Sequence, residues 1–168
     1  MRYLTIVRHC EAGEAANDYD RTLTTRGRAQ AEQLRRWVED PDALATYGPT
    51  TALVSAAART RETYALGFAG TAFVNALETS ELIYNGRREV TGEDLLAQLA
   101  ELDPVRDSLL VIAHNPSVFD LVATLTSELP EVLARGEYPV GTAVVLAVPD
   151  NTPVGRATYE CVATFVPA

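Results

Sequence analysis

The amino-acid sequence predicts an α/β fold with a central, largely parallel sheet that is covered by helices. Short apolar runs typical of strands alternate along the chain with segments that have the apolar periodicity of helices. The chain has 168 residues, of which 47% are hydrophobic, enough for one well-buried core and too few for two ordinary domains. Polar side chains follow three of the apolar runs, and ligands of such sheets bind at the carboxyl ends of strands. We therefore expect residues 1–168 to form a single domain with a site at that edge.

Six segments have the short apolar character of strands. They are residues 3–7, 51–55, 71–75, 108–113, 141–148 and 157–166. The last two are neighbours in the sequence, so we expect them to form an antiparallel edge of the sheet across a turn from Pro149 to Arg156.

Two helices are expected in the first half of the chain. Thr24 or Thr25 can cap a helix that extends to about Asp40, because its apolar residues form one stripe. Pro41 is expected to end this helix. Residues 57–68 have the pattern of a second helix.

Two further helices are expected in the second half. The segment Thr91–Asp94 has the form of a capping box and precedes four periodically spaced leucines. Pro116 suits the first turn of a helix that extends to about Glu128. With the strands, these helices complete the alternation that an α/β fold requires.

The charge of the chain argues against a nucleic-acid partner. The chain has 14 basic residues, all of them arginine, against 23 acidic ones, which gives a formal net charge of −9. A general basic surface for nucleic acid is therefore not expected. Any cluster of arginines on such an acidic chain indicates a local anion site, because it is built against the overall field.

The sequence also predicts a soluble, cytoplasmic protein that does not enter a membrane. No segment offers about 18 consecutive apolar residues, and the N-terminus lacks the pattern of a signal peptide. The two cysteines, Cys10 and Cys161, lie far apart and form no paired motif. Neither a disulfide framework nor a four-thiolate zinc site is therefore expected, which fits a reducing compartment.

Candidate functional residues follow three of the predicted strands. Arg8 and His9 come directly after residues 3–7, Ser55 and Arg59 come at the end of and after residues 51–55, and His114 follows residues 108–113. A guanidinium group matches the oxygens of a phosphoryl group, and a neutral imidazole is a nucleophile near pH 7. Separate strand ends that converge on these groups would form a site for binding and attacking phosphate.

The order of these residues resembles the histidine phosphatase superfamily, also called phosphoglycerate mutase-like. Four segments match in order, and together they span most of the chain. They are Arg8-His9, Leu23-Thr24 with Gly27, Ser55 with Arg59 and Thr63, and His114 with Pro116. The short length and the stretch from Asp20 to Gly27 are similar to the SixA-type phosphohistidine phosphatases. The resemblance implies a three-layer αβα sandwich around a mostly parallel sheet of about six strands.

The resemblance also implies a role for each matched residue. His9 would be the nucleophile that forms a phosphohistidine intermediate. Arg8 and Arg59 would clamp the phosphoryl oxygens, and His114 would donate a hydrogen bond to them. Arg21 would be a further phosphate or substrate contact. The scheme needs no metal and no cofactor, because the arginines supply the positive charge that magnesium provides elsewhere.

The proton donor for the leaving group is less well defined by the sequence. Glu81 lies near the position where the family places an acidic residue, which makes it a possible proton donor, and a surface carboxylate is the competing interpretation. Asp18 and Asp20 are further acidic candidates in the loop after His9.

Structural interpretations compete with the catalytic ones. Either histidine could be a hydrogen-bonded core residue, and Arg59 could form an exposed ion pair on its helix. Arg21 could pair with Asp18 or Asp20 instead of with a substrate.

Cys10 invites a different mechanism, in which its thiolate is the nucleophile. Cysteine-dependent phosphatases need an arginine six residues after the cysteine, and Ala16 stands there. Cys10 is therefore expected to be a small packing residue. A transition-metal site formed by His9, Cys10 and His114 is conceivable, although the sequence provides no other ligand cluster.

The function expected from these residues is that of a metal-independent phosphohydrolase. Its partner would be a phosphorylated protein carrying phosphohistidine, or a small phosphorylated metabolite. A noncatalytic module that captures a phosphorylated partner with the same pocket is the alternative from another class. Mutase activity is a third possibility, but few positive residues beyond the pocket could hold a substrate carboxylate.

Overall fold

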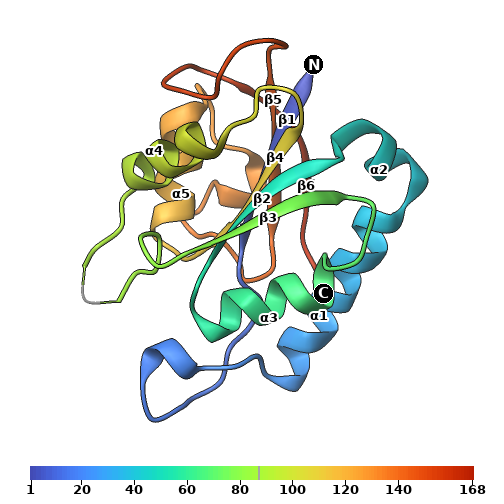
Figure 1. Cartoon of the computed structure of the whole chain (residues 1–168). Coiled ribbons are helices and arrows are strands. Elements are labelled where there is room, and N and C mark those ends of the chain that lie inside the picture. The colour runs from blue at the N-terminus through green and yellow to red at the C-terminus, as the bar shows by residue number, and fades with distance from the viewer. Residues whose placement is uncertain (87) are drawn as a thin grey trace.

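The computed structural model describes residues 1–86 and 88–168. Its six-stranded sheet has the order β3-β2-β4-β1-β5-β6 (Figure 1). The strands are β1 (Arg2–Arg8), β2 (Thr50–Ser55), β3 (Val74–Ser80), β4 (Ser108–Ala113), β5 (Ala143–Val148) and β6 (Glu160–Phe165). The helices are α1 (Thr25–Glu39), α2 (Pro41–Tyr47), α3 (Ala58–Gly67), α4 (Gly92–Leu102), α5 (Ser117–Leu125) and the short 3₁₀ turns η1 (Asp18–Asp20) and η2 (Glu131–Leu133).

The sheet is mixed, with a parallel half and an antiparallel edge. Strands β3, β2, β4 and β1 run parallel, whereas β5 runs antiparallel to both β1 and β6. Every residue of β2, β4 and β5 is buried, which explains why these strands have continuous apolar sequences. The expected antiparallel pairing of the last two strands is confirmed.

Helices cover both faces of the sheet and form three layers. Helices α4 and α5 pack together on one face, while α1 and α3 pack together on the other (Figure 1). Each face has its own core of buried side chains, one containing Leu95, Leu121 and Val144 and the other containing Leu34 and Phe68. The expected αβα sandwich is therefore confirmed.

Side-chain caps define the starts of α1 and α4, two of the four helices that the sequence predicted. The Thr24 hydroxyl accepts a hydrogen bond from the Gly27 N–H at the start of α1. At the start of α4, Thr91 and Asp94 bond each other's backbone N–H groups, as a capping box requires. The last helix ends at Leu125, three residues earlier than the expected Glu128.

Two features differ from the prediction. The strand expected at 71–75 lies further along the chain, as β3 from Val74 to Ser80. It is the edge strand of the sheet and is largely exposed, so its sequence is polar and gives no strand pattern. Pro41 follows the end of α1, as expected, but it also begins α2, which the sequence did not predict. The Asp40 carboxylate caps α2 by accepting from the backbone N–H groups of Asp42 and Ala43, and proline is well tolerated at the first helical position. In the part of the chain that the structure describes, no helix is both long and apolar enough to cross a membrane.

Gly27 fixes the loop that follows β1 against the start of α1. A Cβ atom at this position would lie 2.0 Å from the carbonyl oxygen of Glu11. Thr24 binds the same segment, since its backbone N–H donates to the Glu11 carbonyl oxygen over 3.0 Å. The loop from β1 to α1 therefore passes close to the helix, and this brings residues 17–21 to the carboxyl end of the sheet.

We predict that Gly27→Ala destabilises the protein by at least about 2 kcal/mol, because the clash is with backbone and overpacking usually costs about 1–3 kcal/mol. This loss outweighs the gain of about 1 kcal/mol that alanine brings to a helix. Urea unfolding measures the difference. Gly155→Ala is the control, because a Cβ atom there would meet no atom of the described residues within 4 Å, and its stability should change by less than about 0.5 kcal/mol. Equal stability of both variants would contradict the close approach.

Candidate active site

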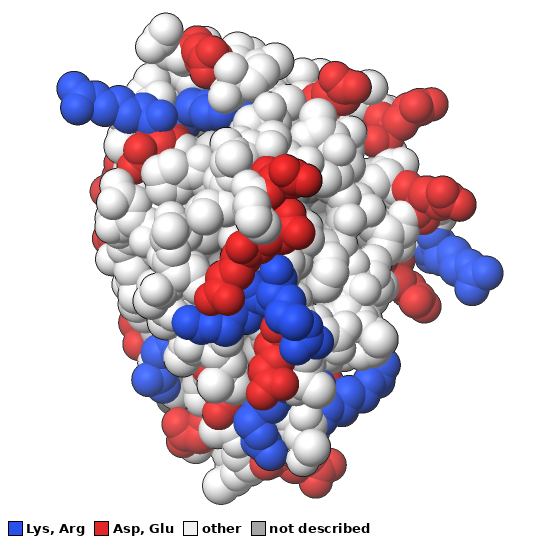
Figure 2. All heavy atoms as spheres, turned by 90° about the vertical axis from the view of Figure 1, so that its right-hand side faces the viewer, with Lys and Arg blue, Asp and Glu red and all other residues white. Residues whose placement is uncertain are grey.

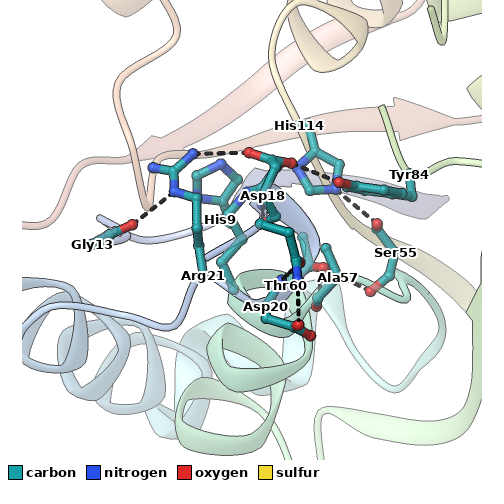
Figure 3. A network of polar contacts seen from close by, with 12 residues as sticks. His9, Gly13, Asp18, Asp20, Arg21, Ser55, Ala57, Thr60, Tyr84 and His114 are labelled. Carbon is teal, nitrogen blue, oxygen red and sulfur yellow. Dashed lines mark hydrogen bonds and ion pairs between the residues drawn. The ribbon is translucent and has the colours of Figure 1, made fainter. Parts of the chain in front are cut away.

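A pocket of about 610 Å³ opens at the carboxyl ends of the parallel strands. Five of the residues predicted to act together line it, namely Arg8, His9, Arg21, Arg59 and His114. Its other lining residues are Asn17, Asp18, Tyr19, Tyr84, Asn85, Gly86 and Asn115. Figure 3 shows His9, His114, Arg21 and Asp18 close together, although they come from separate elements.

The hydrogen bond of His9 determines which ring nitrogen is available for chemistry. Nδ1 of His9 lies 2.7 Å from the carbonyl oxygen of Cys10. A carbonyl oxygen can only accept, so Nδ1 carries the ring proton and Nε2 keeps its lone pair. Burial, assisted by the charges of Arg59, Arg8 and Arg21, lowers the pKa of His9 to about 3 although the bond to Cys10 opposes this shift. The ring is therefore neutral at pH 7, as a nucleophile must be.

The backbone around His9 is held from both sides. Gly141 donates its N–H to the carbonyl oxygens of Arg8 and His9, each over 3.0 Å. On the other side, the Cys10 N–H donates to the Thr63 hydroxyl over 3.0 Å, and that hydroxyl donates to the carbonyl oxygen of Arg59 over 2.8 Å. Thr63 thus connects the segment that carries His9 to the helix that carries Arg59.

His114 faces His9 across the pocket, with ring centroids 5.4 Å apart. Its Nε2 lies 2.7 Å from the hydroxyl of Ser55, the last residue of β2 (Figure 3). Burial, followed by the proximity of His9 and Arg59, lowers the pKa of His114 to about 2. When Ser55 donates to Nε2, the neutral ring carries its proton on Nδ1, a buried atom without a hydrogen-bond partner among the described residues. That N–H is available to an oxyanion.

Two arginines add positive charge next to the histidines. Arg8 donates from Nη1 to the carbonyl oxygen of Tyr138 over 2.7 Å, which orients its guanidinium. Burial and then the nearby Arg59 lower the pKa of Arg8, as expected for two neighbouring positive charges. The Nε atoms of both arginines are buried and have no partner among the described residues. An unpaired buried donor costs about 1–3 kcal/mol, and phosphoryl oxygens would satisfy both donors.

Asp18 joins the arginines at the mouth of the pocket. Its Oδ2 accepts from Arg59 over 3.0 Å and from the Tyr84 hydroxyl over 2.7 Å, and its Oδ1 accepts from Arg21 over 3.1 Å. Desolvation acts against ionisation, but the hydrogen bonds from Tyr84, Arg21 and Arg59 outweigh it and lower the pKa of Asp18 to about 2. Asp18 is therefore a carboxylate at neutral pH and has no proton to donate.

Two of the acidic residues that the sequence offered as proton donors, Glu81 and Asp20, do not line the pocket. Glu81 follows β3 directly, and its carboxylate accepts a hydrogen bond of 2.7 Å from the Tyr19 hydroxyl. Tyr19 itself lines the pocket. The backbone carbonyl oxygen of Glu81 accepts from the Tyr84 N–H over 3.2 Å, so Glu81 touches the pocket through two lining tyrosines and not directly.

Cys10 is fully buried, and its burial raises the pKa of the thiol to about 12 despite the hydrogen bond with Thr63. A thiol with such a pKa is protonated at pH 7 and is a poor nucleophile. Among the described residues, no group of three or more His, Cys, Asp and Glu side chains could hold a metal ion.

Tyr84 and Tyr138 belong to the site although the sequence did not indicate them. Tyr84 lies in the loop after β3, and its ring is perpendicular to Tyr19 with centroids 5.0 Å apart. Tyr138 contributes a backbone carbonyl group, which leaves no signal in the side-chain pattern. Both reach the site through loop geometry, so neither the spacing of residues nor their periodicity could have indicated them.

On one face of the molecule, positive and negative side chains are mixed (Figure 2). On the face that forms the right side of Figure 1, arginines lie among aspartates and glutamates and form no continuous positive area (Figure 2). This face therefore provides no broad basic surface of the kind that nucleic-acid binding requires.

Neither a protein-family model nor a curated protein matches this sequence. Solved structures match over nearly the whole chain. A candidate phosphohistidine phosphatase SixA from Nakamurella multipartitia is 23% identical, with a TM-score of 0.78 over 99% of this chain and 96% of that chain. The protein histidine phosphatase SixA complexed with tungstate is 22% identical, with a TM-score of 0.76 over 98% of this chain and 97% of that chain.

A mycobacterial glucosyl-3-phosphoglycerate phosphatase is more distant, with 14% identity and a TM-score of 0.65 over 95% of this chain and 96% of that chain. This chain has the fold of these structures. The phosphoglycerate mutase-like architecture expected from the order of the motifs is thereby confirmed.

We predict that acid destabilises the protein as soon as the pH falls below about 6.5. The histidines of an unfolded chain protonate near that pH, whereas burial keeps His9 and His114 neutral in the folded protein. The unfolded state then binds more protons, so the free energy of unfolding decreases with falling pH by at most about 1.4 kcal/mol per pH unit for each histidine. Urea unfolding at several pH values between 7.5 and 5 measures this slope before Asp18 begins to titrate.

His9→Gln removes one of the two groups and serves as the control for this prediction. The slope between pH 6 and pH 5 should then fall to about half of the wild-type value, because only one extra proton is bound on unfolding. A wild-type slope in this variant would show that His9 is not kept neutral by folding.

Proposed function

We propose that this protein is a phosphohydrolase that acts through a phosphohistidine intermediate on His9 and removes phosphate from phosphohistidine in a protein. The observation that carries the proposal is the neutral ring of His9, which keeps the Nε2 lone pair and lies in a pocket with three arginines. A pocket that only binds phosphate needs positive charge but no neutral imidazole of fixed tautomer, and this favours catalysis over a binding module.

In the first step, Nε2 of His9 attacks phosphorus, and the bond from phosphorus to the leaving nitrogen breaks. The leaving imidazole takes the electron pair. In the second step, water attacks the phosphorus bound to His9, which releases inorganic phosphate and restores the neutral histidine. The net reaction consumes one water and returns a free histidine side chain to the substrate protein.

The buried donors stabilise the charge that moves onto the phosphoryl oxygens. Arg8 and Arg59 offer Nε–H groups without competing partners among the described residues, and His114 offers Nδ1–H when Ser55 donates to its Nε2. Preorganised donors are effective, because they need no reorganisation during the reaction. The scheme therefore requires no metal, since guanidinium groups supply the positive charge.

The leaving group indicates the substrate class. An alkoxide is a strong base and benefits from a general acid, whereas a phosphoimidazole whose second nitrogen is protonated leaves as neutral imidazole. Asp18 is the only carboxyl group among the described residues that line the pocket, and it is ionised at neutral pH. A site with this composition favours cleavage of a P–N bond.

Small phosphate esters are the second candidate substrates. The similarity of the fold to a glucosyl-3-phosphoglycerate phosphatase favours this alternative, although that similarity concerns the fold alone. The same attack by His9 would serve both classes, so substrate preference has to be measured separately from mechanism.

We expect His9→Ala to reduce phosphate release to the background rate, because the variant lacks the nucleophile. The assay uses a phosphohistidine peptide and a panel of phosphate esters in excess chelator. Cys10→Ala is the matched control at the adjacent buried position and should keep most of the activity, since a thiol with a pKa of about 12 takes no part in the attack. Turnover by a folded His9→Ala variant would rule out this nucleophile.

We expect Glu81→Gln to change hydrolysis of both substrate classes by less than about threefold, because Glu81 does not line the pocket. The comparison is between the phosphohistidine peptide and an ester with a poor leaving group, such as glycerol phosphate. General acids typically contribute about 10²–10⁴-fold. A loss of that size on the ester alone would identify Glu81 as the proton donor.

A further inference from the structure

Asp18 binds two of the three arginines that line the pocket, Arg59 and Arg21. Its carboxylate accepts from Nη2 of Arg59 over 3.0 Å and its backbone carbonyl accepts from Nη1 over 2.8 Å, so both terminal nitrogens of Arg59 are bound to one residue. Arg21 reaches the other carboxylate oxygen over 3.1 Å (Figure 3). A carboxylate and a phosphoryl group make the same kind of bond to guanidinium, so the two compete.

We propose that Asp18 is a specificity-determining residue. Its carboxylate is an internal anion that the phosphoryl group of a substrate displaces from Arg59. The displaced carboxylate then favours substrates in which the group bonded to phosphorus carries a positive charge, as a protonated phosphoimidazole does. This inference rests on the proposed function, because it concerns the preference of the same pocket for phosphohistidine over other phosphate compounds. It assigns Asp18 no proton transfer, since its carboxylate is already ionised.

The exposure of Asp18 allows a phosphoryl group to replace its carboxylate on Arg59. The side chain of Arg59 is only 6% exposed, whereas that of Asp18 is 48% exposed on the three-residue turn η1. The arginine therefore belongs to the rigid wall, and the carboxylate is the partner that moves. After losing Arg59, the carboxylate can keep its bonds to the Tyr84 hydroxyl and to Arg21. It then remains at the mouth of the pocket, held by these two partners.

The charges in the pocket explain the selectivity. Three arginines and one aspartate give the lining a formal charge of +2 when both histidines are neutral, which balances a phosphoryl dianion. A protonated imidazole attached to phosphorus brings a positive charge next to Asp18. This charge replaces the ion pair with Arg59 that Asp18 loses when the phosphoryl group binds. A substrate with an additional carboxylate, such as 3-phosphoglycerate, brings a second negative charge to the same place and is disfavoured.

The surroundings of Asp18 also suit a flat ring. Tyr84 and Tyr19 line the mouth with perpendicular rings, and the Tyr84 ring is in turn edge-on to His114 at 5.7 Å between centroids. The hydrogen bond to Asp18 fixes the Tyr84 hydroxyl, and the guanidinium carbon of Arg59 lies over this ring at 5.9 Å from its centroid, so the ring already accommodates one cation beside the carboxylate. An imidazolium group is attracted by both a carboxylate and an aromatic face.

Oxyanion binding tests the competition without any turnover. Tungstate is titrated calorimetrically into the wild type, Asp18→Asn and Asp20→Asn at pH 7. Asp20 is the matched control, because it lies on the same turn, accepts from Asn17 and does not line the pocket. We expect Asp18→Asn to bind tungstate at least fivefold more tightly and Asp20→Asn to stay within twofold of the wild type. Unchanged or weaker binding by Asp18→Asn would overturn the proposal.

Substrate preference tests the selectivity in the same three proteins. The measured quantity is the ratio of kcat/KM for a phosphohistidine peptide to kcat/KM for 3-phosphoglycerate. We expect this ratio to fall at least tenfold in Asp18→Asn and to remain unchanged in Asp20→Asn. Equal changes of both kcat/KM values in Asp18→Asn would show that the residue has only a structural role and would contradict the selectivity.

The two measurements separate this inference from the proposed function. If the wild type hydrolyses neither compound, the proposed function fails, and tungstate binding alone then decides whether Asp18 competes for the arginines. If the wild type hydrolyses the peptide and the ratio of the two kcat/KM values does not change in Asp18→Asn, the proposed function stands. The proposal that Asp18 determines substrate specificity is then wrong.

Discussion

The hydrogen bond from Nδ1 of His9 to the carbonyl oxygen of Cys10 is the interaction on which the proposed chemistry of this protein depends. It fixes the tautomer of the imidazole, and burial keeps the ring neutral. The bond forms because the backbone at residues 8–10 is held by Gly141 on one side and by Thr63 on the other. Sheet and helix together thus position one nitrogen lone pair.

The two arginines of β1 show how the fold separates structural from functional charge. Arg2, at the start of the strand, forms a buried bidentate ion pair with Asp103 at 2.6 and 2.7 Å and joins the end of α4 to the sheet. Arg8, at the other end, has only the Tyr138 carbonyl group as a hydrogen-bond acceptor among the described residues. Its charge is not neutralised by a buried carboxylate, and it remains available to an anion.

The strand ends of the site were predictable from the sequence, whereas its loops were predictable only in part, since Arg21 and Asp18 were indicated and Tyr84 was not. Arg8 and His114 follow continuous apolar runs, and parallel strands bring such ends to one edge of the sheet. Asp18 and Tyr84 arrive from loops whose course depends on contacts between distant residues, such as Gly27 packing on Glu11. The edge strand β3 was misplaced for a related reason, because its exposed side chains carry no apolar pattern. Apolar periodicity in a sequence indicates which residues are buried, and most residues of β3 and of these two loops are not buried.

The most direct test of this account is to trap the phosphorylated protein during turnover of a phosphohistidine peptide and to locate the phosphate. Rapid quenching at alkaline pH, where phosphohistidine survives, followed by peptide mapping and ³¹P NMR identifies both the residue and the nitrogen. The account predicts phosphate on Nε2 of His9, because Nδ1 is protonated and bound to the Cys10 carbonyl oxygen. Phosphate on Nδ1 of His9, on His114 or on Cys10 would contradict it.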